Sequence, residues 1–523
     1  MSISTHTLKT YLPLHTWCGI ICGLFLYICF IAGSLTLFSE ALNRWATPPQ
    51  AVQPVNADKF PDLIRQVLYA HPEAADGFAI YFQTDSLRPS PLSWGDSKGH
   101  QKPAQHWAFL NANGELDTYD FKVHALGDFM DELHQTAGIP GHLGDEDVGL
   151  LIMGVIAVMY TLALVSGTIL LLPTLLANLF ALRTDKSPRR AWLDSHNLLG
   201  LTSLPFHIVI AATTVVFAFH DSIYLGMDTL LPQEAKMQNL RPPAVEKSAV
   251  NLERLIMPQA FQEAIARKRP DFQMDSIIYS NLEKEAAASA YMQGRVQNGT
   301  RSAVVIANPY HGKWRYNNIS DNPYVNIIDS FFRLHFGDYG GVFIRWIYFL
   351  LGLMGAALFY TGNLLWLEKR PARGKQKNRR DTHILAALTI GTGAGTIAGI
   401  AATLLAARWL YSLPYETENL SYASYYSVFL LFNLYAQYRG AGGATPVLIR
   451  CTAWMVLAIP CSSLLGSVGV LHLFAHHDMA SLGVDATALI LGLGLLTLAK
   501  RSGKRVARAT ADSVWYDKRR KDV

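Results

Sequence analysis

The 523-residue chain is poor in charge, and it has no cysteine outside its apolar segments. Charged residues make up 16% of the chain, against about 25% in a typical soluble protein. All five cysteines lie within apolar runs, so the sequence predicts no disulfide framework in the polar segments. The chain also lacks a Walker motif, a Gly-x-Gly-x-x-Gly fingerprint and a His-Glu-x-x-His motif. These absences exclude an ATP-driven motor, a nicotinamide site of the Rossmann type and a zinc peptidase of that kind.

Long apolar runs take the place of the missing charge. A helix needs about 20 apolar residues to span a bilayer. Eight segments reach or approach that length, and the sixth is the weakest because it is short, rich in tyrosine and interrupted by Asn433. They are approximately 14–38, 148–172, 195–219, 341–366, 384–407, 422–438, 447–471 and 481–499. The first run is too long for a cleaved signal peptide, and we expect it to be a retained helix. The sequence therefore predicts an α-helical integral membrane protein.

The basic residues predict how the helices are oriented. They cluster in the 183–190 loop, in the 368–380 loop and in the segment from residue 500 onward. These three segments fall on one side of the membrane when the spans are counted alternately, and the positive-inside rule makes that side the cytoplasm. Both termini are then cytoplasmic, and the polar segments 41–147 and 220–340 lie outside. Because orientation accounts for the basic runs, we expect no nucleic-acid partner.

The expected organisation follows from the spans and the polar segments. Two small α+β domains interrupt a core of four helices, and four further helices follow this core. The boundaries are 1–40 for the first helix, 41–147 for the first outer domain, 148–219 for helices two and three, 220–340 for the second outer domain, 341–366 for helix four, 367–499 for helices five to eight and 500–523 for a basic tail.

The first two-thirds of the chain is duplicated in its motifs. Each half opens a span with His-x-x-x-Gly, has a Leu-His pair before the returning span, and has Ser-Gly or Thr-Gly near the end of that span. In order, the residues are His15 and Gly19, Leu133 and His134, Ser166 and Gly167 in the first half, and His196 and Gly200, Leu334 and His335, Thr361 and Gly362 in the second half. Between them, each half has a helix, a proline turn, a strand and a hairpin; the hairpin of the first half carries Asn113-Gly114.

The repeated histidines fall into two layers under the predicted topology. His15 and His196 begin helices on the cytoplasmic side, whereas His134 and His335 precede helices on the outer side. Histidines at equivalent positions in two halves can ligate a haem iron from opposite faces. They can instead be interfacial residues that hydrogen-bond to lipid or backbone, or ligands of iron or zinc outside haem. His207, within a span, can line a quinone or proton site or hydrogen-bond inside the bundle, and His142 lies close to His134 in the sequence.

The order and duplication of these motifs resemble those of the PepSY-associated transmembrane proteins, over roughly residues 8–370. The two outer domains are similar to PepSY domains. The resemblance implies an iron-regulated protein of the bacterial inner membrane, and in some members a ferric-siderophore reductase with two bis-histidine b haems. It implies that His15, His196, His134 and His335 are the axial ligands of the haem iron, with His142 and His207 as alternatives.

The expected function is electron transfer from the cytoplasmic side to a ferric siderophore or other iron chelate in the periplasm, which releases ferrous iron. The electron donor is either a quinol or a cytoplasmic reductase. A transporter for a siderophore or a metal is the first alternative, and it predicts interrupted helices. A non-catalytic module whose outer domains bind a peptidase is the second. The outer aromatic residues Trp94, Trp107, Trp314 and Tyr316 are either stacking surfaces for a siderophore or core residues of their domains.

Overall fold

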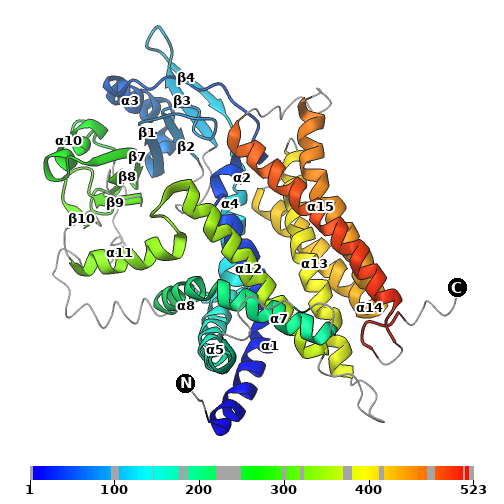
Figure 1. Cartoon of the computed structure of the whole chain (residues 1–523). Helices are drawn as coiled ribbons and strands as arrows, with labels where there is room; N and C mark the ends of the chain where they lie inside the picture. Colours follow the sequence, from blue (N-terminus) through cyan, green and yellow to red (C-terminus); the bar gives the residue numbers. More distant parts are fainter. Residues whose placement is uncertain are drawn as a thin grey trace. The chain divides into compact units, whose positions relative to one another are not determined.

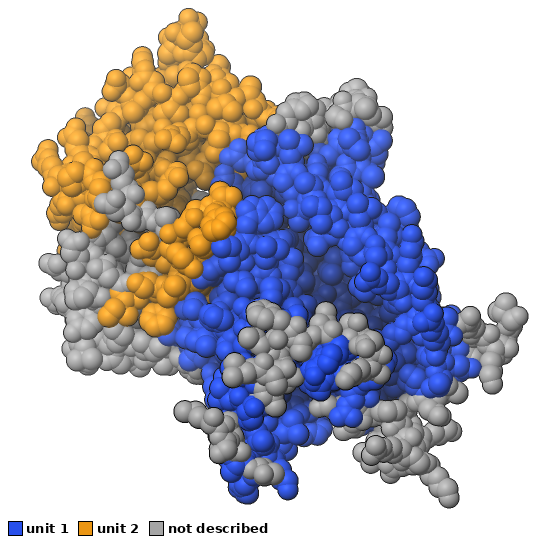
Figure 2. Space-filling view, viewed as in Figure 1, with its two compact units in different colours: residues 1–46, 125–218, 345–523 blue, residues 47–124, 219–344 orange. Residues whose placement is uncertain are grey.

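The computed structural model describes residues 4–95, 105–144, 146–175, 183, 187–218, 249–296, 302–317, 323–368, 380–411, 417–467, 478–510 and 513–517. The chain divides into two compact units, coloured blue and orange in Figure 2. Unit 1 comprises residues 1–46, 125–218 and 345–523, and unit 2 comprises residues 47–124 and 219–344.

Unit 1 is built from helices (Figure 1). They are α1 (Thr5–Thr36), α2 (Ser39–Ala46), α4 (Leu126–Thr136), α5 (Val148–Leu171), α7 (Pro188–Thr202), α8 (Leu204–Ala218), α12 (Gly341–Glu368), α13 (Arg380–Trp409), α14 (Thr417–Ser467) and α15 (Met479–Ala507). A short hairpin of β5 (His142–Leu143) and β6 (Glu146–Asp147) precedes α5, and the 3-10 turn η3 (Leu172–Thr174) follows it. Helix α4 and this hairpin thus belong to unit 1, although they come from the predicted outer segment 41–147.

Six of the described helices are long and apolar enough to cross a membrane, and the bent pair α7 and α8 makes a seventh if it counts as one span. A mostly helical chain with about six such helices agrees with the predicted fold class. Helix α14 contains both predicted spans 422–438 and 447–471, and it is non-helical at Gly440. At about 1.5 Å per residue, its 51 residues would extend about 75 Å, far more than a hydrocarbon core of about 30 Å. Eight spans therefore stay a prediction.

The predicted span 195–219 is broken. Helices α7 and α8 meet at Ser203 and are bent by 67° relative to each other. Pro205 accounts for the break, because proline has no backbone N–H and its ring conflicts with the carbonyl group four residues earlier. The corresponding helix of the first repeat, α1, contains Pro13 but runs unbroken over 32 residues.

Helices α13 and α14 pack closely through small residues. A Cβ added at Gly399 of α13 would lie 2.8 Å from Tyr425 Cδ2, and one at Gly391 would lie 2.7 Å from Asn433 Oδ1. In a membrane, small residues of this kind let helix backbones approach each other. Helix α1 joins this group through Tyr27, whose hydroxyl donates a hydrogen bond to the Gly393 carbonyl at 3.0 Å.

Unit 2 contains an antiparallel sheet of eight strands in the order β10-β9-β8-β7-β1-β2-β3-β4. The strands are β1 (Gly77–Tyr81), β2 (Leu92–Trp94), β3 (His106–Leu110), β4 (Leu116–Asp120), β7 (Phe272–Ser280), β8 (Ser289–Val296), β9 (Ser302–Ala307) and β10 (Trp314–Asn317). Its helical elements are η1 (Ala57–Lys59), α3 (Phe60–Ala70), η2 (Pro72–Asp76), α10 (Pro258–Lys268) and α11 (Pro323–Phe336). The helix, proline turn and hairpin predicted for each repeat are present in this order.

The two predicted outer domains share this one sheet, because β1 of the first repeat pairs with β7 of the second. Phe78 faces Tyr279, and Tyr81 faces Ser276. In the duplication, Phe78 corresponds to Ser276 and Tyr81 to Tyr279, so each residue faces the counterpart of the other. This is the self-complementary pairing that a two-fold axis produces, and here it relates two halves of one chain.

A single apolar core lies between the sheet and its helices. Phe60, Leu63, Ile64 and Val67 recur at helical spacing on one face of α3 and are buried. They belong to the same buried cluster as Phe261 of α10 and the inward residues of β1 and β7. The two repeats thus fold into one packed body within unit 2.

Candidate functional site

The histidines at the starts of the two repeats lie beside each other in unit 1. The ring centres of His15 on α1 and His196 on α7 are 6.2 Å apart, with the ring planes at 65°. These residues are 181 positions apart in the sequence. The structure therefore brings His15 and His196 close together, and their role as shared ligands stays a prediction.

The same backbone contact orients each ring. His15 Nδ1 lies 2.8 Å from the carbonyl oxygen of Ala163 on α5, and His196 Nδ1 lies 3.1 Å from that of Leu358 on α12. A carbonyl can only accept a hydrogen bond, so Nδ1 carries the proton in each ring and donates it. Metal-binding histidines are commonly oriented in this way, with Nδ1 donating to a carbonyl group and Nε2 as the nitrogen that binds the metal.

A glycine one turn beyond each of these carbonyl groups makes room for the ring. A Cβ added at Gly167 would lie 2.8 Å from His15 Cε1, and one at Gly362 would lie 3.3 Å from His196 Cε1. Each glycine is four residues after the accepting carbonyl, on the same face of its helix. Each ring thus lies against a carbonyl group and a glycine of the returning helix, Ala163 and Gly167 for His15 and Leu358 and Gly362 for His196. We call each such carbonyl and glycine a histidine seat. The Ser-Gly and Thr-Gly motifs of the sequence supply the glycines of the two seats.

The pair has the spacing of two imidazoles on one metal ion. An imidazole–metal bond is about 2.0–2.1 Å long and the ring centre lies about 1.1 Å behind the nitrogen, so two imidazoles on opposite sides of one metal have centres about 6 Å apart. Among the described residues, no group of three or more His, Cys, Asp or Glu side chains could hold a metal ion. Within that part of the chain, a metal at this pair would have only the two imidazoles as side-chain ligands.

The glycine of each His-x-x-x-Gly motif leaves space beside the pair. A Cβ added at Gly19 would have no atom within 4 Å, and one at Gly200 would meet only the Leu358 side chain, at 3.4 Å or more. Each glycine lies one turn after its histidine, on the same helix face. A flat ligand between the two imidazoles would meet no side chain from these positions.

The other predicted layer is His134 and His335. His134 on α4 donates through Nδ1 to the carbonyl oxygen of Cys29 at 2.9 Å, with the Cys29 sulfur at 3.3 Å. A Cβ added at Gly33 would lie 2.6 Å from His134 Nδ1. His134 thus has the same kind of seat as His15 and His196. His335 is at the end of α11 in unit 2, where its ring lies 5.5 Å from that of Phe336.

The two alternative ligands have different surroundings. His142 in β5 is exposed, and its Nδ1 is 2.7 Å from Asp147. His207 on α8 is fully buried, and its Nδ1 is 2.6 Å from the Tyr160 hydroxyl. The rings of Phe30, Phe206 and Phe359 lie within 6.1 Å of the His207 ring, and among the described residues its Nε2 has no hydrogen-bond partner. The sequence indicated His207 but not Tyr160. Tyr160 belongs to no repeated motif, so the duplication gave no signal for it.

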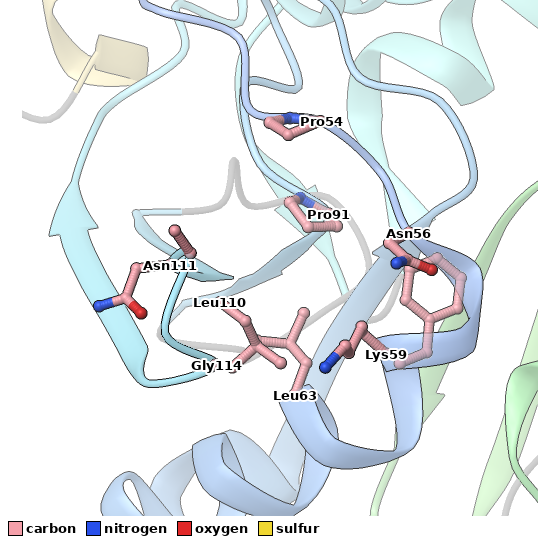
Figure 3. Close-up of a pocket in the computed structure, with 10 residues that line it drawn as sticks. Pro54, Asn56, Lys59, Leu63, Pro91, Leu110, Asn111 and Gly114 are labelled. Atoms are coloured by element: carbon pink, nitrogen blue, oxygen red, sulfur yellow. The ribbon is translucent and has the colours of Figure 1, made fainter.

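A shallow cavity of about 180 Å³ lies in unit 2 (Figure 3). Leu63, Leu110, Lys59 and Gly114 are among its lining residues. It is smaller than the roughly 300–1,000 Å³ typical of ligand pockets, and it offers no histidine or carboxylate. Trp94 and Trp107 are 4% and 2% exposed, so these two predicted stacking candidates are core residues of the sheet.

The fold and the histidine seats define a class of protein. The chain is a multi-pass helical membrane protein in which a duplicated helix pair, α1 with α5 and α7 with α12, holds two facing histidines. A family model described as the PepSY-associated TM region matches residues 12–369. The chain belongs to this family, as its motifs predicted, and α13, α14 and α15 lie beyond the matched region. No curated protein matches the chain.

Proposed function

We propose that the chain is a haem-bearing electron carrier that crosses the membrane and reduces the iron of a ferric siderophore. The observation that supports this most is the His15–His196 pair. Both rings are oriented through Nδ1, so that Nε2 is the nitrogen that would bind a metal, and their centres are 6.2 Å apart, about the distance between two imidazoles on one metal ion. Haem would supply the remaining ligands of the iron, which the described side chains do not provide.

In this proposal, His15 and His196 hold one b haem at the predicted cytoplasmic side. His134 and His335 would hold the second at the predicted outer side, and His142 and His207 are alternatives to the four proposed ligands. The haems would supply one-electron chemistry at a potential that the axial ligands and burial set. The chain's own residues would orient the imidazoles through the carbonyl groups of Ala163 and Leu358.

Reduction explains how the metal would be released. Siderophores bind ferric iron through hard oxygen ligands, and the same ligands bind ferrous iron far more weakly. One electron converts Fe(III) to Fe(II) and weakens the chelate, so no bond of the siderophore has to break. A quinol or a cytoplasmic reductase would supply the electrons. The proposed electron transfer runs from the cytoplasm to the periplasm. The protein would therefore lie in a bacterial inner membrane, with both chain termini in the cytoplasm.

The experiment is a haem count on the detergent-purified protein. We expect sharp reduced bands of six-coordinate b haem after dithionite and two haems per chain by the pyridine haemochrome method. His15→Ala and His196→Ala should each remove the same haem, and His311→Ala, at an exposed histidine of unit 2, serves as the control. Adding a ferric siderophore to the reduced protein should then reoxidise it. A colourless protein from haem-replete cells would refute the proposal.

A transporter for a siderophore or a metal is the second candidate, and the broken span α7–α8 is the observation that favours it. Interrupted helices commonly line substrate sites of transporters. Uptake of an iron-loaded siderophore by proteoliposomes that contain the colourless protein would establish this alternative.

A further inference from the structure

The three long helices beyond the family match contact the histidine-bearing helices at both ends of unit 1. Helices α13, α14 and α15 and the residues that follow them have no counterpart in the duplicated core. They do not contain any of the proposed ligands. Their contacts with α7 and α4 nevertheless indicate what they do.

At one end, the segment 513–517 docks against the core. Trp515 is 6% exposed, and its Nε1 donates a hydrogen bond to Glu368 at the end of α12, at 2.7 Å. Arg505 of α15 pairs with the same carboxylate. The Arg505 guanidinium also lies over the ring of Trp515 at 5.3 Å and over the ring of Trp192 on α7 at 5.4 Å. Trp192 is one helical turn before His196, so these contacts reach the helix that carries a proposed ligand.

The docking site is shaped for this segment. A Cβ added at Gly442 of α14 would lie 2.2 Å from the Trp515 carbonyl oxygen, and one at Gly443 would lie 3.0 Å from the Asp517 carboxylate. Arg439 pairs with Asp517 at 3.3 Å. Only glycines in α14 allow the backbone of the segment to lie this close, so the contact is specific.

At the other end, the start of α14 contacts α4, the helix of His134. The Phe129 ring lies 5.5 Å from that of Tyr422 and 5.8 Å from that of Tyr425. The Tyr422 hydroxyl donates to Glu132. The Tyr426 hydroxyl donates to the carbonyl of Gly138, just after α4, at 3.0 Å.

The helices held in this way are short. Helix α7 has 15 residues and is separated from α8 by the break at Ser203, and α4 has 11 residues. Isolated helices of about 12–15 residues are marginal, so tertiary contacts must hold both of them. Helices α7 and α4 are not parts of long continuous spans. Their own backbone hydrogen bonds would not place His196 and His134 with the accuracy that metal ligation needs.

We propose that the C-terminal extension is a two-ended brace, in which Trp515 and Arg505 position α7 and the tyrosines of α14 position α4. The haem readouts of this inference rest on the proposed function, but the contacts do not. The extension would thus position the helices that carry proposed haem ligands, although it contains none of these ligands. Trp515, Arg505, Tyr422 and Tyr426 are positioning residues in this assignment.

The test uses two variants of the full-length protein, one at each end. Trp515→Ala removes the contact with Arg505 and Glu368. The double variant Tyr422→Phe with Tyr426→Phe removes two hydroxyl groups and keeps both rings, so it should still fold. We expect Trp515→Ala to raise amide hydrogen exchange in residues 188–202 at least tenfold and to leave residues 126–136 unchanged. The tyrosine variant should do the reverse.

The haem spectra give the second readout. Trp515→Ala should change the absorption bands of the six-coordinate haem that His196→Ala removes. The tyrosine variant should change the absorption bands of the other haem only. Trp515→Phe, which keeps an aromatic ring, should restore most of the signal. Deletion of residues 518–523, which removes four basic residues, is the control and should change neither readout.

Equal effects of both variants on both helices, or no effect of either, would overturn the brace. A colourless wild-type protein would refute the proposed function, and the exchange measurement would still decide whether the brace exists.

Discussion

The two repeats of the core agree at the histidine seats and differ elsewhere. In each repeat, a histidine donates to a carbonyl group on the returning helix and packs against a glycine four residues later. Beyond these seats, α1 is continuous whereas α7 and α8 are bent by 67°. The position eighteen residues after the histidine is Gly33 in the first repeat and Thr214 in the second. Duplication has thus preserved the seats, while the surrounding helices have diverged.

The buried pair of Tyr160 and His207 belongs to the diverged part. His207 is eleven residues after His196, and the matching residue of the first repeat is Leu26. Tyr160 is seven residues before Gly167, and the matching residue before Gly362 is Gly355. A Cβ added at Gly355 would lie 3.0 Å from His207 Cε1. The pair is therefore not a copy of an axial seat, and the comparison predicts that its role is packing.

The largest expected effect is a loss of haem when a seat is filled. Gly167→Ala places a methyl group 2.8 Å from His15 Cε1, and Gly362→Ala places one 3.3 Å from His196 Cε1. We expect Gly167→Ala to remove most of one haem and Gly362→Ala to remove less, measured by pyridine haemochrome. Gly154→Ala in α5 is the matched control, because a Cβ there meets nothing within 4 Å. Full retention of haem in Gly167→Ala would show that the seat does not hold a ligand.

A smaller effect is expected where the repeats differ. Tyr160→Phe removes the hydroxyl that lies 2.6 Å from His207 Nδ1 and leaves a buried imidazole without its partner, which should lower stability by about 1–3 kcal/mol. His207→Leu should also destabilise the protein. Both variants should keep two haems, and thermal unfolding of the purified protein would measure the loss of stability. Loss of a haem in His207→Leu with two haems in His335→Ala would instead make His207 an axial ligand.

The smallest effect is expected in the two hairpins of unit 2. Gly114 and Gly312 have φ of +80° and +64°, a region that suits glycine and costs other residues about 1 kcal/mol or more. Gly312→Ala should cost slightly more than Gly114→Ala, since its Cβ would lie 3.3 Å from Ile256 Cδ1, whereas nothing lies within 4 Å at position 114. Hydrogen exchange of β3 and β9 would measure both costs. Equal costs would mean that Ile256 moves aside.

Much of the secondary structure was predictable, because runs of apolar residues and turn-forming residues specify it locally. The apolar runs predicted α1, α5, α12 and α13, and the Asn-Gly turn predicted the β3–β4 hairpin. The break in span 195–219 was not predicted, although Pro205 was a visible signal, because the run as a whole has the length of one span. Gly440, with φ +73° and ψ 158°, interrupts α14 between the two predicted spans 422–438 and 447–471.

The duplicated histidines and glycines were visible in the sequence, and the structure brings together one predicted pair, His15 and His196. The sequence did not reveal that Gly167 and Gly362 are the seats, that Cys29 accepts from His134, or that Tyr160 meets His207. These contacts join helices that are far apart in the chain. Hydrophobic periodicity shows which face of a helix is buried but does not show which residue faces it.

The sequence by itself determined that this is a membrane protein with a duplicated core, since membrane insertion and helix formation follow from runs of apolar residues. The family followed from the order of short motifs. Only the tertiary structure decided that His15 and His196 face each other, that β1 and β7 join the two repeats in one sheet, and that the C-terminal helices hold α7 and α4. Each of these depends on side chains from distant segments packing together, and packing is a property of the whole folded chain.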